Sequence, residues 1–364
     1  KYTYETLFVR SANTISCPFC SKPAKRNGYY VSGTRRYRCT ACRRSFVRSS
    51  RAPVTFQDFR AFHRYVTGRH NRLGSAEYQG YSLRTVADRF TTFLDHPISA
   101  FDAWEILPPK TEPTAREWVY GCDGKWLRRV GVFFIHRNVT TKENLWWSFM
   151  ASETYETIGK DCKALAGRLD GHLPMGAVSD WKGAIVAAVA SHFGEIPHQR
   201  CLAHVVRQAK RLLPVNSPFK ATKKLRWIAE NITVLETTRD PAVWNRLLVR
   251  WDEEYGAMLK EKTVAPAGTT RKWWYTHGNV RRAWRLMTHD QDPLFVFLIN
   301  PLIPNTNNAL EGVNSNLKQK LGDHRGMSVQ RQTSFLSWYM VFTRSKSDTD
   351  LKKLWVYQKS EFSR

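Results

Sequence analysis

The segment Glu117-Trp-Val-Tyr-Gly-Cys-Asp-Gly-Lys125 is the first of three β-rich runs that follow one another at short intervals. The next two runs cover residues 129–139 and 144–152. All three are dense in Val, Phe and Trp, which are residues that favour strands. We therefore predict three consecutive strands.

The hydrophobic period changes after the third run. Residues 154–169 place apolar side chains on one helical stripe, which predicts a helix. A short strand is expected at 177–180, an Ala- and Val-rich helix at 183–193, and a last strand near 198–202. The order βββαβαβ predicts a mixed sheet with helices on its faces, an α/β layer architecture.

Two aspartates stand at expected strand ends. Asp123 falls near the end of the first strand, and Asp180 falls at the end of the fourth. If these strands are neighbours, the two carboxylates lie side by side at the edge of the sheet. Adjacent carboxylates repel each other unless they share a proton or a metal, and oxygen ligands of this kind suit Mg²⁺. Each Asp alone is also consistent with a residue that caps a turn.

A later segment, Asn305-Thr-Asn-Asn-Ala-Leu-Glu-Gly-Val-Asn314, predicts an amphipathic helix. Its polar stripe consists of Asn307, Glu311, Asn314 and Lys318, and its apolar stripe of Leu310, Val313, Leu317 and Leu321. Glu311 could then face the metal site, while Asn314 and Lys318 face a nucleic-acid backbone. An ordinary surface helix is the alternative, but it would predict nothing about Asp123 and Asp180.

Together these elements resemble the RNase H-like core of DDE transposases of the Mutator-like superfamily, and most closely its bacterial insertion-sequence members. The segment Cys201-Leu-Ala-His204 resembles the CxxH element of that family, and Thr306–Gly312 resembles its terminal glutamate helix. The segment Asp323-His-Arg-Gly-Met-Ser328 extends the match. The resemblance covers roughly residues 116–214 and 304–345.

The resemblance implies a DNA transposase that binds the terminal repeats of its element and catalyses metal-dependent cleavage and strand transfer. It implies that Asp123, Asp180 and Glu311 are catalytic and hold two Mg²⁺ or Mn²⁺ ions. It also places Cys201 and His204 near the active site as supporting residues, with a buried Cys and a hydrogen-bonded core His as the alternative. The tail that extends the match adds Arg325 to the residues expected to bind DNA.

The amino-terminal part carries two CxxC motifs, Cys17-Pro-Phe-Cys20 and Cys39-Thr-Ala-Cys42, with 18 residues between them. Each motif can direct two thiolates at one tetrahedral ion, and the spacing is typical of a zinc ribbon. We expect residues 1–54 to form such a ribbon with one structural Zn²⁺. A pair of disulfides is the alternative, and a basic chain without a secretion signal argues against it.

Residues 55–107 are predicted to be helical. Ser82 is expected to cap a second helix over 83–90, after a loop that contains glycines. Two helices around a loop resemble a DNA-binding helix-turn-helix with Arg84 and Arg89 exposed, and a small helical spacer is the alternative. Many insertion-sequence enzymes of the family begin with a zinc ribbon and a helix-turn-helix.

The remaining boundaries follow from composition. Residues 108–115 are rich in proline and are expected to form a linker. Residues 215–303 are predicted to be an all-α insertion that divides the catalytic core into 116–214 and 304–364. The insertion carries six of the 14 Trp: Trp227, Trp244, Trp251, Trp273, Trp274 and Trp284. We expect these to form its core, with stacking on flipped bases as the alternative.

The charge of the chain indicates a nucleic-acid partner. Lys and Arg number 57 against 31 Asp and Glu, which gives a net charge of +26. Such a charge favours binding to phosphates, whereas an anionic membrane surface or a solvated face without a partner are weaker alternatives. Residues 1–54 hold twelve basic residues and one acid. The ribbon arginines expected to contact phosphates are Arg35, Arg36, Arg38, Arg43 and Arg44.

No apolar run approaches the roughly 18–20 residues of a membrane span, and no secretion signal is evident, so we expect a cytoplasmic, nucleoid-associated bacterial protein. Double-stranded DNA, as element ends and as target, is the expected partner, and paired ends favour a homodimer on DNA. Two rival functions stay open. One is an RNase H-fold nuclease or resolvase that cleaves without joining, and the other is a DNA-binding regulator derived from a transposase.

Overall fold

The computed structural model describes residues 15–17, 20, 22–31, 33–47, 54–68, 71–109, 117–128, 130–270, 272–324 and 326–362. The chain is a mixed α/β protein. It divides into two compact units, an N-terminal unit (Lys1–Thr55) and a main unit (Phe56–Arg364), which are described separately. Most of the predicted linker, residues 110–115, and Arg325 lie outside the described residues.

The N-terminal unit is a small antiparallel sheet. Its strands are β1 (Ile15–Ser16), β2 (Pro23–Tyr29), β3 (Arg35–Cys39) and β4 (Ser45–Val47), hydrogen-bonded in that order. The ring of Tyr37 is buried and stacks on Phe46 with the centroids 6.0 Å apart. A core of this size is far below what a free-standing domain needs, so the unit depends on a further cross-link.

A five-stranded sheet is the centre of the main unit. It consists of β5 (Val119–Leu127), β6 (Gly131–Asn138), β7 (Glu143–Met150), β8 (Gly176–Ser179) and β9 (His198–Arg200), in the order β7-β6-β5-β8-β9. The first three strands are antiparallel, and β8 and β9 run parallel to β5. The predicted order βββαβαβ is thus confirmed, and the first and fourth strands are neighbours.

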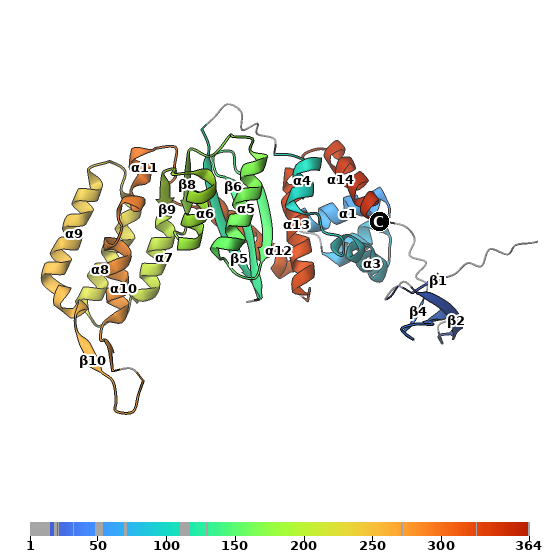
Figure 1. The fold of residues 1–364 in the computed structure, drawn as a ribbon, viewed down its shortest axis with the longest axis horizontal. Coiled ribbons are helices and arrows are strands. Elements are labelled where there is room, and N and C mark those ends of the chain that lie inside the picture. Colours follow the sequence, from blue (N-terminus) through green and yellow to red (C-terminus); the bar gives the residue numbers. More distant parts are fainter. Residues whose placement is uncertain are drawn as a thin grey trace, which may run out of the picture. The chain divides into compact units, whose positions relative to one another are not determined.

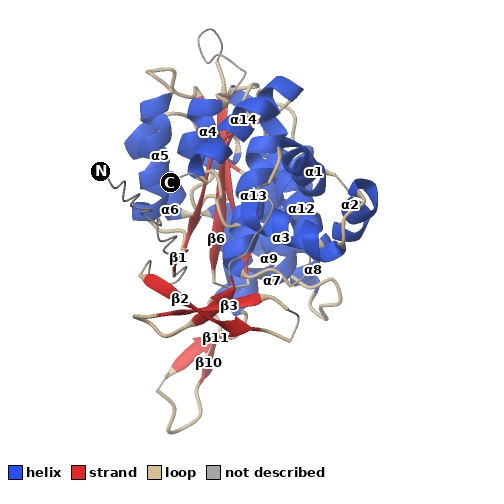
Figure 2. Ribbon diagram, turned by 90° about the vertical axis from the view of Figure 1, so that its right-hand side faces the viewer, coloured by secondary structure: helices blue, strands red, loops and turns tan. Residues whose placement is uncertain are grey.

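Helices cover both faces of this sheet. On one side lie α5 (Tyr155–Arg168) and α6 (Gly183–Phe193), and on the other α12 (Asn308–Asp323) and α13 (Val329–Arg344) (Figure 2). Every residue of β6 is buried, because this strand is covered on both faces. Such burial explains why residues 132–135 form a continuous apolar run rather than an alternating one, although the strand ends in three buried polar residues.

The helices of residues 56–107 pack with the C-terminal helices. They are α1 (Phe56–Thr67), α2 (Arg72–Gln79), α3 (Leu83–Leu94) and α4 (Ala100–Ile106), and their partners are α13 and α14 (Asp348–Glu361). The ring of Phe59 contacts Trp338, Phe342 and Trp355 at centroid distances of 5.5, 5.6 and 5.7 Å. This aromatic core is shared, so residues 56–107 do not pack as a unit of their own.

Two details of this region differ from the prediction. The helix α2 occupies the segment expected to be a loop, although Ser82 caps α3 as predicted and accepts a hydrogen bond from the N–H of Thr85. Arg89 is not exposed as predicted: it pairs with the buried Asp58 of α1 and its guanidinium lies 4.2 Å from the ring centroid of Tyr81. The sequence does not reveal this pair, because Asp58 lies on α1 and Arg89 on α3, with α2 between them.

Between the sheet and α12 the chain forms a helical insertion. It begins before the predicted boundary at residue 215, because α7 (Leu202–Leu212) packs into the same core. The other helices are α8 (Lys220–Glu230), α9 (Asp240–Tyr255), α10 (Gly278–Thr288) and the short α11 (Val296–Ile299), with 3₁₀ turns at Asn231–Val234, Gly256–Leu259 and Asp292–Leu294. Trp244 and Trp251 are buried in its core, and their indole N–H groups donate to the carbonyls of Ile228 and Ala221 (both 2.9 Å). The predicted tryptophan core is thus confirmed for these two residues.

The prediction that the insertion is entirely helical is wrong. A two-stranded hairpin, β10 (Lys262–Val264) and β11 (Trp273–Tyr275), extends from the insertion helices (Figure 1). Each strand has three residues, which is too short for an alternating pattern to be recognised. Trp273 and Trp274 remain 43% and 41% exposed on this hairpin. Among the described residues, no helix is long and apolar enough to cross a membrane.

Candidate functional site

Asp123 lies in the middle of β5, not near its end as predicted, and Asp180 directly follows the neighbouring parallel strand β8. The two strands are paired from Val119 and Gly176 as far as Gly121 and Val178. Burial raises the pKa of the Asp123 carboxyl, and the negative charge of Asp180 raises it further, while His204, the N–H of Gly124 and Lys182 oppose the shift. The charge of Asp180 therefore acts on Asp123.

The helix α12 is held against the same strand at its first turn. The side-chain amide of Asn307 donates to the carbonyl of Cys122 (3.0 Å), and its backbone N–H donates to Sγ of Cys201 (3.1 Å). The N–H of Leu202 donates to the carbonyl of Asn305 (2.9 Å). These bonds bring the chain back to the sheet after the insertion, and they place Glu311 in the first turn of a helix that contacts β5.

This close approach requires glycine at position 121. A Cβ atom on Gly121 would lie 2.6 Å from Cγ2 of Val139, 3.1 Å from Oδ1 of Asn307 and 3.3 Å from Cδ1 of Leu310. All three distances are tighter than ordinary contacts, and the first requires a neighbour to move. Glycine therefore allows the glutamate helix to reach the strand that carries Asp123.

We predict that Gly121→Ala lowers the free energy of unfolding by about 1–3 kcal/mol, because it overpacks the contact between β5 and α12. Denaturant unfolding of the full chain measures this. Gly167→Ala is the matched control, since Gly167 is an exposed residue of α5 with no atom within 4 Å of the added Cβ. The control should be neutral or stabilising. Equal stability of both variants and the parent would contradict the argument.

Glu311 is bound to basic residues of α7. Nη2 of Arg207 lies 2.8 Å from each carboxylate oxygen, and Nδ1 of His204 lies 3.8 Å from Oε1. The ligand atoms of Cys201, His204 and Glu311 all lie within 4.8 Å of one another. The helix α7 thus contacts Glu311 with its polar side, while Val205 and Ala209 on its other side belong to the core of the insertion.

Asn314 lies at the site rather than free for a nucleic-acid backbone. Its Nδ2 donates to Oδ2 of Asp123 (2.7 Å), so α12 supplies both Glu311 and a hydrogen-bond partner for the first aspartate. Lys318, one turn further along, is exposed as predicted, and so is Arg84 on α3. The structure therefore groups Glu311 with His204 and Cys201, and it joins Asp123 to the same helix through Asn314. The ligand atoms of Asp123 and Asp180 do not belong to the group that contains Glu311.

Sequence reasoning missed a fourth acid. Glu153, in the junction between β7 and α5, has a side chain only 6% exposed, and its carboxylate occupies the space next to Gly124 where a Cβ would lie. Nζ of Lys182 contacts Glu153 and lies 3.1 Å from Oδ2 of Asp180. The residue after Asp180, Trp181, has a positive φ of 67°, which is unusual for a bulky residue and often marks functional sites.

Several buried polar atoms at this site lack a hydrogen-bond partner. Among the described residues, Oε1 of Glu153, Oδ1 of Asn314 and Nδ1 of His204 are buried without a hydrogen-bond partner. A buried acceptor of this kind costs free energy unless a donor or a cation satisfies it. Carboxylate and amide oxygens are the ligands that Mg²⁺ and Mn²⁺ prefer, so the residues present fit a divalent cation.

The four cysteines of the N-terminal unit form a second candidate metal site. Their Sγ atoms lie within 4.8 Å of one another, with Cys17 and Cys42 3.6 Å apart and Cys20 and Cys39 3.4 Å apart. All four are free thiols. Four ligands at a Zn–S distance of ~2.3 Å are about 3.8 Å apart in a tetrahedron. The cluster can therefore bind a metal such as zinc with little rearrangement.

The pKa of one of these thiols favours metal binding. Desolvation opposes ionisation of Cys39, but hydrogen bonds from the backbone of Cys42 and Ala41 and from the thiol of Cys20 outweigh it and lower the pKa to about 6. The thiolate is the form that binds metal. Around the cluster, Arg38, Arg43 and Arg44 are exposed, whereas Arg35 and Arg36 are half-buried and donate to the Tyr29 hydroxyl and the carbonyl of Asn27.

Comparison with known proteins adds no assignment to this geometry. No model of a known protein family matches the chain, and no curated protein matches it.

Proposed function

We propose that this protein is a DNA transposase of the DDE type with an RNase H-like catalytic core and an amino-terminal zinc ribbon. One observation carries the proposal: Asp180 directly follows β8, the parallel neighbour of the strand that carries Asp123, and Glu311 lies on a helix that is bonded to that strand after the whole helical insertion.

In the proposed mechanism, Asp123, Asp180 and Glu311 would hold divalent cations. Such cations would lower the pKa of water and stabilise the charge that develops on a phosphodiester. Asn314 orients the Asp123 carboxylate through its hydrogen bond. Lys182 and Arg207 neutralise Asp180 and Glu311, and they supply positive charge beside the position of a DNA backbone.

The partner in this proposal is double-stranded DNA. The chain carries a net charge of +26, and Arg38, Arg43 and Arg44 are exposed beside the cysteine cluster. Exposed arginines on a rigid scaffold can neutralise phosphates and read base edges. Arg84 and Lys318 remain candidate contacts, whereas Arg89 stabilises the contact between α1 and α3.

Incubation of the full chain with its flanking genomic DNA, a second duplex and Mg²⁺ tests the proposal. We expect products in which an element end is joined to the second duplex, and we expect Asp123→Asn and Asp180→Asn to remove them. Cleavage without joining would identify a nuclease or resolvase. Binding without cleavage in Mg²⁺ and in Mn²⁺ would identify a regulator.

We further predict that Glu153→Gln weakens Mn²⁺ binding by about tenfold or more, since residues that support metal ligands typically have effects of this size. Isothermal titration of the full chain measures the affinity without DNA. Glu156→Gln is the matched control, because Glu156 is an exposed residue of the first turn of α5 and lies only three positions away. Unchanged Mn²⁺ affinity in Glu153→Gln would show that Glu153 serves only to hold Lys182.

A further inference from the structure

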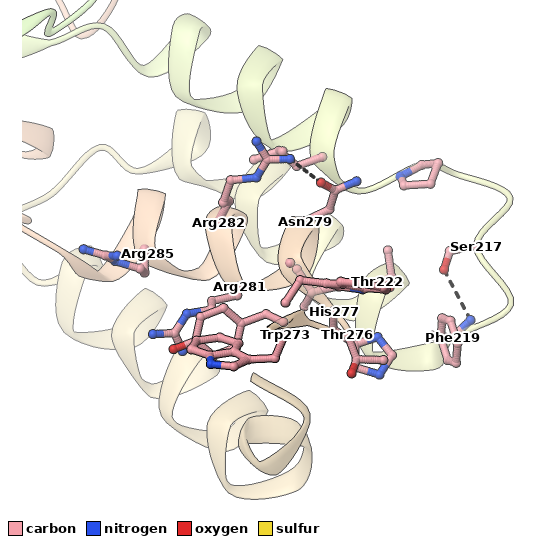
Figure 3. Close-up of a pocket in the computed structure, with 16 residues that line it drawn as sticks. Ser217, Phe219, Thr222, Trp273, Thr276, His277, Asn279, Arg281, Arg282 and Arg285 are labelled. Atoms are coloured by element: carbon pink, nitrogen blue, oxygen red, sulfur yellow. Dashed lines mark hydrogen bonds between the residues drawn. The ribbon is translucent and has the colours of Figure 1, made fainter. Parts of the chain in front are cut away.

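The insertion carries a cleft lined by aromatic and basic side chains. It has a volume of about 850 Å³ and lies between the β10–β11 hairpin, the start of α8 and the N-terminal half of α10 (Figure 3). Trp273, Trp274 and Phe219 line it and are each more than 40% exposed. Arg281, Arg282 and Arg285 of α10 also line it, and Arg281 lies beside Trp273, whereas Arg282 and Arg285 lie apart from the rings (Figure 3).

Cations already lie over the aromatic rings at this cleft. Nζ of Lys262 lies 4.0 Å from the ring centroid of Trp273, and the guanidinium of Arg281 lies 4.1 Å from that of Tyr275. In contrast, Arg282 and Arg285 are exposed, and neither forms an ion pair with an acid in the part of the chain that the structure describes. The cleft therefore offers exposed aromatic surface and unneutralised positive charge together.

A second cleft adjoins the first. It has a volume of about 700 Å³ and shares Arg282, Arg285 and Leu212 with the first. Arg211 and Trp181 also line it, together with one acid, Asp290. Trp181 is the residue that follows Asp180, so the second cleft reaches a neighbour in sequence of one candidate catalytic residue, although none of the three carboxylates lines it.

We propose that these two clefts bind an unpaired DNA strand, with bases stacked on Trp273 and Trp274 and phosphates neutralised by Arg211, Arg282 and Arg285. This inference deepens the proposed function. It depends on that function only to explain where the unpaired strand comes from. Stacking platforms interleaved with basic side chains are what single strands require, because every base has an apolar face and the phosphates follow a flexible backbone. A duplex keeps its bases stacked on one another and cannot use exposed indoles in this way.

The test compares strands with and without bases. Fluorescence anisotropy of the full chain, in EDTA so that no cleavage occurs, measures affinity for an oligothymidylate of about ten nucleotides, within the length that such sites cover. A matched oligomer of abasic residues carries the same phosphates. We expect the double variant W273A/W274A to bind the oligothymidylate about tenfold or more weakly and the abasic oligomer as the parent does.

Two further variants complete the design. Trp227→Ala is the matched control, because Trp227 is 56% exposed on α8 and lines neither cleft. The double variant R282Q/R285Q should weaken the binding of both oligomers and reduce its salt dependence, with a slope smaller by about 0.7 for each phosphate that the variant no longer neutralises. Thermal unfolding of each variant establishes that the fold is retained.

Three results would overturn the inference. W273A/W274A could bind the oligothymidylate as tightly as the parent, or its affinity for both oligomers could fall by the same factor. The variant could also change the oligomeric state without changing the affinity for single strands, which would assign the hairpin to a protein interface. Since none of these measurements depends on cleavage, a protein that binds as expected but never cleaves would overturn the proposed function and leave this inference standing.

Discussion

Glu311→Gln is expected to lower the rate of DNA cleavage by about 10³-fold or more while DNA affinity stays close to that of the parent. The substitution keeps the size of the side chain and removes the charge that a metal ligand needs. It also weakens the pair with Arg207, but Arg207 is 52% exposed, so the cost in stability is small. Single-turnover cleavage and filter binding on the same DNA measure the two quantities.

A charge-matched control distinguishes the loss of a metal ligand from the loss of one negative charge. Glu253→Gln removes one acid from the exposed surface of α9 and should cleave at the parental rate. Cleavage by Glu311→Gln within about tenfold of the parent would refute the assignment of Glu311 as a metal ligand. A crystal structure with DNA and metal bound, in which Glu311 lies far from Asp123 and Asp180, would refute it as well.

Removal of zinc is expected to unfold the N-terminal unit and leave the main unit folded. Structural zinc contributes on the order of 10 kcal/mol or more to the folding of small domains. In this unit, the stacked pair of Tyr37 and Phe46 offers little apolar burial to replace it. Cys39→Ser or a strong chelator should therefore make residues 15–47 sensitive to limited proteolysis, while residues 117–324 stay resistant.

Thr40→Ser is the control for this experiment, because it changes the residue next to Cys39 and keeps a hydroxyl that can donate to the carbonyl of Pro23. Metal analysis of protein purified without chelator should find about one zinc per chain. A protein without bound metal that still protects residues 15–47, or one that contains a Cys17–Cys42 disulfide, would disprove the zinc assignment.

The sequence predicted the first three strands well because they are long, rich in β-branched and aromatic residues, and separated by short turns. It left open whether the first and fourth strands are neighbours, and the structure shows that they are. It placed Asp123 too close to the end of its strand, because β5 continues to Leu127. The cysteine cluster was found from spacing alone, because two CxxC motifs already fix two pairs of ligands. For these strands and for the cysteines, the signal is local in the chain.

The features that sequence reasoning missed depend on contacts between distant segments. Arg207 is one of several basic residues on α7, and nothing in its neighbourhood distinguishes it before α12 is placed beside it. Glu153 was overlooked because Thr154 already explains the start of α5 as its N-cap. The shared core of α1, α13 and α14 joins the two ends of the main unit, and periodicity within one helix does not identify its partner.

The helix α7 packs against the core of the insertion on one side and contacts Glu311 on the other, so it joins the insertion to the candidate site. Val205 and Ala209 are fixed in the core of the insertion, while His204 and Arg207 on the same helix contact Glu311. The chain leaves and returns at one point, where Leu202 is hydrogen-bonded to Asn305. A displacement of α7 would therefore move the side chains that contact Glu311 together with the core of the insertion.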